Sequence, residues 1–413
     1  MKSFLTVSQF LVFMTLLLAL LSGISVGAPN DADPNALVKL VKGNTAFAFD
    51  LYGQLRGAEG NVFLSPYSIS TALAMTYGGA RGDTARQMAE VLHFHLDGSR
   101  LHGAFKALTD RMRAVEKAGS VHLKVANALW PQAGYPFRKE FRDLVETAYD
   151  STVTAVDYDQ GLEEARTRIN GWVEEKTERK IRDLIPPGTP LTRLVLVNAI
   201  YFKATWAYRF DRSFTQERPF HPQPGKSVSV PMMAQKHRFQ YGESGELQVL
   251  ELPYAGHELA MIVLLPRKRD GLNALEASLN PKNLERWLST MDERDVEVFL
   301  PRCKLTSTFE LSQPLQSLGM TEAFRWPGAN FSGMDGSDRL YLSKVLHKTF
   351  VDVNEEGTEA AAATAVEMVE GARLSTQKPL VFRADHPFLF LIRDRLTASI
   401  LFVGRVIDPT QEQ

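Results

Sequence analysis

The segment Glu355–Leu374 has the sequence EEGTEAAAATAVEMVEGARL, and its pattern is the most informative in the chain. Its alanine content favours a helix. At alternate positions, however, the residues from Thr358 to Met368 are small or apolar and uncharged, whereas the positions between them include Glu359 and Glu367. This alternation is typical of a strand with one face against a core. The two glutamates are also compatible with a two-turn helical repeat, so the segment has strand potential without excluding a helix.

The composition outside this segment is that of a globular protein. The chain has 413 residues, of which 44% are hydrophobic and 23% are charged, and this excludes disorder, collagen and coiled coil. The net charge is -1, so no global field attracts nucleic acid or an anionic membrane, and we expect neither as a partner. The single cysteine, Cys303, excludes an intrachain disulfide and multi-cysteine metal sites. Because Cys303 lies beside an apolar stretch, we expect a buried, inert thiol.

The first residues have the order of a secretory signal. A weakly basic start at Lys2 is followed by an apolar run from Phe10 to Leu21 and by small residues that end at Ala28. The run is short for a membrane span, although an uncleaved anchor is the alternative. We therefore predict a signal peptide over residues 1–28 and a secreted protein, extracellular or, in a bacterial host, periplasmic. The sequon at Asn330 matters only in a eukaryotic host.

No linker, charge block or repeat divides residues 29–413, which we interpret as a single domain. Helical spacing dominates the first third, where Ser65-Pro66 predicts a helix start and Gly78-Gly79 its end. Helices before strands, with strands distant in sequence, predict an α+β fold. Further helices are predicted over 101–118 and 162–184, and strands over 121–130, 194–202, 228–233, 247–252, 259–265, 296–300, 380–382, 388–392 and 400–406.

Enzyme and metal signals are weak. His93 and His95 have no third ligand at a metal spacing, and the chain contains no nucleophile elbow, zinc-helix motif or phosphate loop. We therefore predict no metal, no cofactor and no catalytic activity. A basic helix face with Lys106, Arg111, Arg113 and Lys117 is a weak candidate for a polyanion site, and a solvated helix face is the simpler interpretation.

Several long motifs resemble the serpin family, and they occur in the family's order over nearly all of residues 37–409. One resembles the helix entry beneath the main sheet, one the central strand with the breach tryptophan, one the proximal hinge of the reactive-centre loop, and two the closing strands. These motifs are Asn61–Ser70 (NVFLSPYSIS), Asn198–Trp206 (NAIYFKATW), Glu355–Ala362 (EEGTEAAA), Ala384–Phe390 (ADHPFLF) and Phe402–Val406 (FVGRV).

The resemblance implies a fold of three β-sheets and about nine helices, with an exposed reactive-centre loop over about 355–378. It assigns a hinge, a polar cluster called the shutter, and a region called the breach. The hinge is Glu355, Glu356, Gly357, Thr358, Glu359, Ala360, Ala361 and Ala362; the shutter is Ser65, Ser68, Asn198 and His347; the breach is Trp206, Arg302 and Glu355. The family usually has lysine where this chain has Arg302, which can bind a carboxylate through two hydrogen bonds. A plain surface pair between Arg302 and Glu355 is the alternative.

The resemblance also implies an inhibitor of serine endopeptidases, with cysteine endopeptidases as a further target class, that is consumed by its target. The protease serine attacks the loop and forms an acyl-enzyme, which is trapped when the cleaved loop enters the inhibitor's own sheet. Insertion would bury one face of the loop, where an unpaired charge would cost several kcal/mol. The face from Thr358 to Met368 has no charge, and Gly357 to Lys378 contains no proline, so the sequence permits insertion.

The bait bond is less well defined. Counting from Glu355 by the length usual in the family places it at Gly371-Ala372, which predicts an elastase-like or subtilisin-like target. Cleavage at Arg373-Leu374 is the alternative and would predict a trypsin-like target, whose acidic pocket binds arginine. We expect a monomer. A non-inhibitory serpin that acts as a carrier or chaperone is the other function considered; its hinge would contain charged, bulky or proline residues.

Overall fold

The computed structural model describes residues 34–358 and 379–411. The predicted signal peptide therefore lies outside the described residues, as do hinge residues Glu359 to Ala362 and both candidate bait bonds. No helix within the described ranges is both long enough and apolar enough to span a bilayer.

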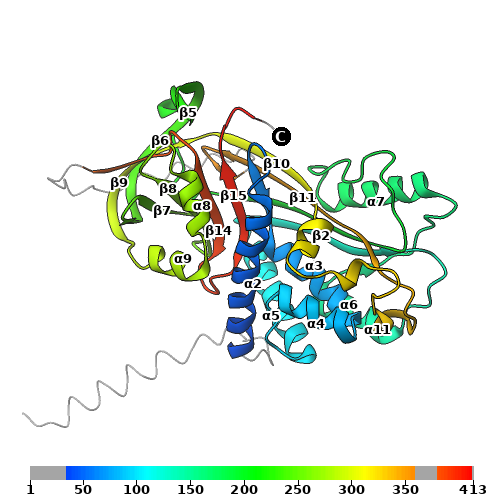
Figure 1. Cartoon of the computed structure of the whole chain (residues 1–413). Helices are drawn as coiled ribbons and strands as arrows, with labels where there is room; N and C mark the ends of the chain where they lie inside the picture. Colours follow the sequence, from blue (N-terminus) through cyan, green and yellow to red (C-terminus); the bar gives the residue numbers. More distant parts are fainter. Residues whose placement is uncertain (1–33, 359–378, 412–413) are drawn as a thin grey trace, which may run out of the picture.

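Ten α-helices occur in the described part of the chain, most of them in its first half (Figure 1). Helix α3 begins as predicted, because the Ser65 side chain caps it by accepting from the Ser68 N–H and Pro66 occupies its first position. The helices are α2 (Pro34–Leu55), α3 (Pro66–Gly79), α4 (Gly82–Val91), α5 (Gly98–Lys117), α6 (Lys139–Tyr149), α7 (Leu162–Lys176), α8 (Leu272–Ser278), α9 (Pro281–Leu288), α10 (Ser312–Ser317) and α11 (Ser332–Asp335).

Helix α7 is shorter than predicted, since it ends at Lys176 and not near residue 184. Thr177 is buried, and its hydroxyl donates to the Val173 carbonyl while it accepts from the Ile181 N–H. Glu178 and Arg179 then adopt positive φ angles of 51° and 62°. The helix is thus terminated by a threonine side chain and a left-handed turn.

A six-stranded sheet forms the centre of the molecule, and we call it the main sheet. Its order is β10-β11-β12-β4-β2-β3, and β11 also pairs directly with β4 in parallel below β12. No strand was predicted at β10 or β11. The strands are β2 (Val121–Pro131), β3 (Thr152–Val153), β4 (Leu194–Thr205), β10 (Cys303–Glu310), β11 (Leu342–Asn354) and β12 (Gly357–Thr358).

The remaining strands join in one nine-stranded sheet. Three sheets were expected, but two of them merge within the described residues because β6 pairs with β5 and β9 along most of its length and with β7 at its end. The strands are β1 (Val62–Leu64), β5 (Gln216–Gln223), β6 (Lys226–Ser244), β7 (Leu247–Pro253), β8 (Leu259–Pro266), β9 (Asp292–Pro301), β13 (Leu380–Arg383), β14 (Phe388–Asp394) and β15 (Ile400–Val406).

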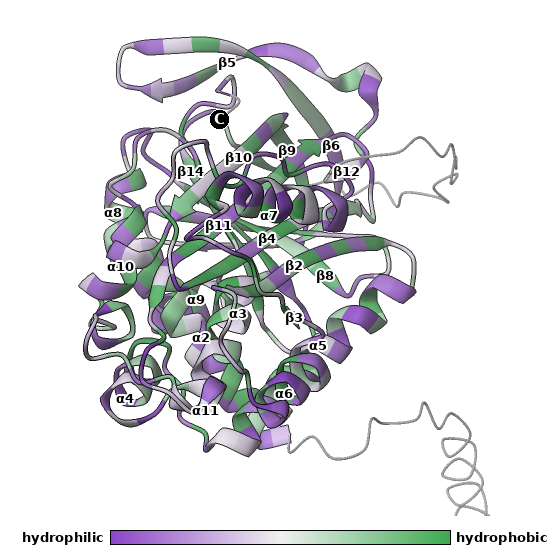
Figure 2. Ribbon diagram, turned by 90° about the vertical axis from the view of Figure 1, so that its right-hand side faces the viewer, coloured by the Kyte–Doolittle hydropathy of each residue, from purple (hydrophilic) through white to green (hydrophobic). Residues whose placement is uncertain are grey.

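The main sheet is covered on both faces along β4, which explains why Asn198 is the single polar residue from Leu194 to Phe202 of that strand. One face contributes to the large core with α2, α3 and the nine-stranded sheet. The other face packs against α7, where Ile169 and Val173 join a smaller core with Trp130 and Val197. Figure 2 shows hydrophobic colour on the central strands and hydrophilic colour on much of α7. The fold is thus α+β, and the central strand β4 of the main sheet is buried over nearly its whole length.

Candidate functional site

A buried polar cluster lies in the middle of the main sheet. The register places Asn198 on β4 opposite both His347 on β11 and Asn127 on β2. The Asn198 Nδ2 group donates to the Ser68 hydroxyl at 2.5 Å and to Asn127 Oδ1. The Ser65 hydroxyl donates to the Leu401 carbonyl of β15 at 2.7 Å, so this residue connects α3 to the nine-stranded sheet. The four residues assigned to the shutter are therefore brought together in one network.

Asn127 is a fifth member of this cluster that was not predicted. It is 7% exposed and accepts hydrogen bonds from both Asn198 and Ser68. Its signal in the sequence is the same as that of Asn198, namely an asparagine between apolar residues of a strand. Such a buried amide requires partners.

His347 is neutral in this cluster. Its Nε2 atom accepts from the Ser65 N–H at 3.1 Å, so Nδ1 carries the proton and donates to Asn198 Oδ1. Burial lowers the pKa of His347 to about 3, although the hydrogen bond to Asn198 opposes the shift. Protonation of Nε2 would place two donors face to face, so the cluster is specific for the neutral ring.

The hinge begins inside the main sheet. Gly357 and Thr358 form β12, which pairs antiparallel with β11 on one side and with β4 on the other. Gly357 has a φ of +153°, and a Cβ atom there would lie 2.0 Å from the Ala204 carbonyl oxygen. Thr358 is fully buried, and its hydroxyl is 2.8 Å from the Tyr254 hydroxyl. This position therefore requires glycine followed by a small uncharged side chain.

Glu355 is held beside the start of β12. It is 2% exposed, and its carboxylate accepts from Arg302 Nε at 2.7 Å and from the Thr215 hydroxyl at 2.5 Å. Burial alone would raise the pKa of Glu355, but the hydrogen bonds from Arg302 and Thr215 outweigh it and lower the pKa. The pair expected from the resemblance is thus formed; its glutamate side chain is buried, and its arginine side chain is exposed.

Trp206 fixes the chain on either side of Glu355. Its indole N–H donates to the Asn354 carbonyl, and its backbone N–H donates to the Glu356 carbonyl, both at 2.9 Å. Its ring stacks on Tyr254 with centroids 4.7 Å apart. Arg212 also forms an ion pair with Glu356 at 2.6 Å. The breach and hinge residues within the described ranges therefore form one contiguous network.

Beyond the short ladders that they form with β12, strands β4 and β11 pair with each other. Leu342 to Phe350 of β11 pair with Leu194 to Tyr201 of β4, so no other strand lies between them along this stretch. The main sheet is therefore closed from Phe350 and Tyr201 onward, which lie three positions along β11 and β4 from the last β12 pair.

Other predicted positions have ordinary surroundings. Cys303 is buried, and burial raises the pKa of its thiol to about 12, as expected for an inert thiol. His93 contacts Asp50 at 2.7 Å, and no metal-ligand cluster is found among the described residues. Asn330 is half-buried, and its Oδ1 atom accepts from Ser332.

The basic helix face is largely neutralised. Arg111 on α5 forms ion pairs with Asp394 at 3.0 Å and with Glu258 at 3.3 Å. Lys106 and Arg113 both contact Asp110 of the same helix. This arrangement favours a solvated helix face over a polyanion site.

Comparisons with known proteins agree with this geometry. A family model described as serpin (serine protease inhibitor) matches residues 42–409. An uncharacterized serpin-like protein of Thermococcus kodakarensis is 43% identical, with 90% of this chain and 86% of that protein covered. The leukocyte elastase inhibitor of Bos taurus is 42% identical, with 90% and 100% covered.

Solved structures show the same relationship. Uncleaved ovalbumin matches with a TM-score of 0.82 and 32% identity, covering 90% of this chain and 100% of that one. Human thyroxine-binding globulin matches with a TM-score of 0.82 and 31% identity, covering 91% and 100%. The chain therefore belongs to the serpin family and has the serpin fold.

Proposed function

We propose that the protein is a secreted inhibitor that traps serine endopeptidases, inserting its cleaved reactive-centre loop between β4 and β11. In this proposal a single serpin domain follows the signal peptide, and the hinge, shutter and breach residues have the roles that the family assigns to them. The protein is then consumed by its target and is not an enzyme.

The observation that carries the proposal is the position of β12. This strand already pairs with both β11 and β4, and these two strands pair with each other from Phe350 and Tyr201 onward. Continuing the register of β12 along β4 places Ala360 beside Phe202, Ala362 beside Ile200, and Thr364 beside Asn198. Phe202 and Ile200 belong to the large core, so the uncharged face of the loop would face apolar side chains.

The register along β11 leads to the same alignment. Thr358 pairs with Val353, so Thr364 would lie opposite His347. Since Asn198 and His347 now pair with each other, an inserted strand would place the Thr364 hydroxyl between them. A hydroxyl can both donate and accept, and it could replace the hydrogen bond that insertion breaks.

The target class follows from the bait bond. Cleavage at Gly371-Ala372 suits an elastase-like or subtilisin-like protease, and the similarity to a leukocyte elastase inhibitor supports the elastase class. Cleavage at Arg373-Leu374 suits a trypsin-like protease.

One experiment tests inhibition and the bond together. The purified protein is incubated with elastase, trypsin and subtilisin, and the products are separated on denaturing gels. We expect a covalent adduct with at least one enzyme, and mass spectrometry of the released C-terminal peptide identifies the bond. Cleavage by all three enzymes without any adduct would contradict the proposed trapping mechanism.

That result would instead favour a non-inhibitory carrier, which is the second candidate because the structure also resembles thyroxine-binding globulin. Secretion is tested separately by expressing the full chain and sequencing the N-terminus of the exported protein. We expect it to start near residue 29. Retention of the unprocessed chain inside the cell would contradict the predicted signal.

A further inference from the structure

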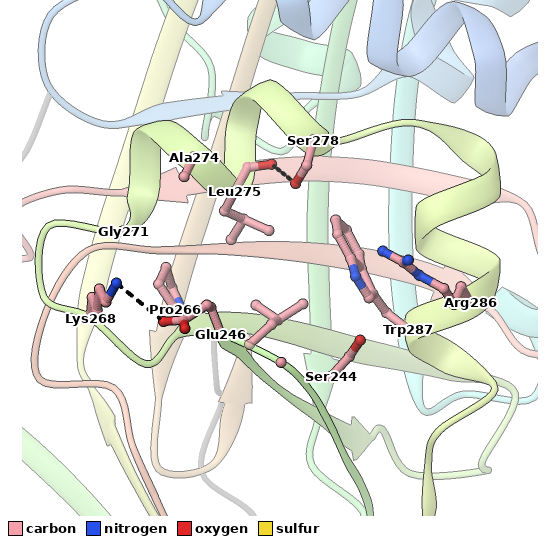
Figure 3. A pocket seen from close by; sticks show the side chains of 12 residues that line it. Ser244, Glu246, Pro266, Lys268, Gly271, Ala274, Leu275, Ser278, Arg286 and Trp287 are labelled. Carbon is pink, nitrogen blue, oxygen red and sulfur yellow. Dashed lines mark hydrogen bonds and ion pairs between the residues drawn. The ribbon is translucent and has the colours of Figure 1, made fainter.

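A cavity of about 390 Å³ lies where α8 and α9 pack near the turn between β6 and β7. None of the residues that line it belongs to the hinge, the shutter or the breach. Its walls include the apolar side chains of Leu247, Pro266, Leu275 and Trp287. Figure 3 shows Trp287 on α9 facing Leu275 on α8 across this space. A volume of this size falls within the range of small-molecule sites, which are mostly apolar with a few polar groups.

The polar groups at one end of the cavity are donors that have no acceptor. Trp287 is only 4% exposed, and its indole N–H makes no hydrogen bond within the described residues. The guanidinium of the neighbouring Arg286 likewise has no carboxylate partner there. Although the Trp287 side chain is largely buried, its N–H is not a fully buried atom, so it is accessible to a ligand as well as to water. The Trp287 indole N–H and the Arg286 guanidinium are therefore a neutral and a cationic hydrogen-bond donor that have no anionic acceptor among the described residues.

The opposite end of the cavity is electrically balanced. Lys268 and Glu246 line it and form an ion pair with 3.7 Å between Lys268 Nζ and Glu246 Oε2. Figure 3 shows this pair on the far side of the space from Arg286 and Trp287. The excess positive charge thus lies at the Arg286 end.

We propose that this cavity binds a small aromatic carboxylate. Its carboxylate would accept from the Arg286 guanidinium and the Trp287 indole N–H, and its ring would lie between Leu275 and Leu247. The proposal depends neither on the loop nor on protease inhibition. In this proposal the Arg286 end of the cavity recognises the negative charge of the ligand, and the apolar walls recognise its aromatic ring.

The test uses 1-naphthaleneacetate and its neutral amide, 1-naphthaleneacetamide, in isothermal titration calorimetry with the full-length protein. A hydrogen bond to a charged group is worth enough that the acid should bind about tenfold more tightly than the amide. Arg286→Gln should weaken acid binding by about tenfold and leave amide binding unchanged. Lys282→Gln is the matched control, because Lys282 is an exposed cation on α9 that does not line the cavity.

Trp287→Phe keeps an aromatic wall but removes the N–H, and it should weaken binding of the acid more than that of the amide. Because Arg286 is exposed, its substitution should not affect folding and decides the question if the Trp287 variant is unstable. Equal affinity for acid and amide, unchanged acid binding by the Arg286 variant, or no binding of the acid at millimolar concentration would each overturn the proposal.

Discussion

Replacing Thr358 with arginine should convert the protein from an inhibitor into a substrate. Thr358 is fully buried between β11 and β4, and its hydroxyl has Tyr254 as its partner. An arginine there either buries a guanidinium without a carboxylate or forces β12 out of the main sheet. In both cases the loop cannot continue into the sheet along the observed register.

The size of the effect can be estimated from these contacts. Burying an unpaired charge costs several kcal/mol, and leaving the Tyr254 hydroxyl without a partner costs about 1–3 kcal/mol more. If only about 3 kcal/mol of this raises the insertion barrier, insertion slows on the order of 100-fold. Hydrolysis of the acyl-enzyme would then outrun trapping, and most of the variant would be released as cleaved protein.

The assay is a titration of the target protease with wild-type protein and variants, followed by denaturing gels. Thr358→Ser is the matched control, since it keeps the hydroxyl bonded to Tyr254 and adds no charge. We expect Thr358→Ser to form the covalent adduct and Thr358→Arg to appear almost entirely as the cleaved form. Adduct formation by Thr358→Arg at the wild-type stoichiometry would refute the insertion argument.

Three further predictions concern stability. Cleavage of the loop should raise the melting temperature sharply, because the freed segment can complete the main sheet; calorimetry of intact and nicked protein measures this, and a nicked form that melts no later would contradict it. Gly357→Ala should lower the melting temperature of the intact protein by several degrees, since the added Cβ would lie 2.0 Å from the Ala204 oxygen; an unchanged melting curve would show that β12 does not occupy this position. Burial lowers the pKa of His347 to about 3, so below about pH 6.5 the unfolded chain binds a proton that the folded protein does not. The free energy of unfolding should therefore fall by about 1.4 kcal/mol per pH unit between about pH 6.5 and the folded-state pKa of about 3. Above about pH 6.5 this group should have no effect on stability. Chemical denaturation between pH 7 and 4 measures this slope, and His347→Gln should reduce it; equal slopes in both proteins would contradict the assignment.

Local signals in the sequence were sufficient to predict much of the fold. The α3 start follows from Ser65-Pro66, and the apolar run of β4 predicts its burial on both faces. Asn198 on that run predicts a buried polar network, because an amide cannot be buried without partners. Each of these inferences needs only the neighbouring residues.

Features that depend on distant residues could not be predicted in this way. Strand β11 contains His347 and Thr349, which are polar but fully buried, and their partners Ser65 and Phe63 lie far away in sequence. Polar residues of this kind obscure the hydrophobic pattern of a buried strand. The end of α7 was missed for a related reason, since the side chain of Thr177 terminates the helix without a glycine or proline.

The direction of β4 relative to β11 has a consequence for where the protein can open. These two strands run parallel, whereas β10 with β11 and β2 with β4 form antiparallel ladders. Parallel ladders are slightly less stable per residue than antiparallel ones. Among the long strand pairings of the main sheet, the one between β4 and β11 is therefore the easiest to separate. A strand inserted between them in the direction of β12 would be antiparallel to both β4 and β11, and it would replace one parallel ladder with two antiparallel ladders. The parallel pairing of its central strands would therefore make the main sheet separate most easily between β4 and β11, and an inserted antiparallel strand would stabilise the separated state.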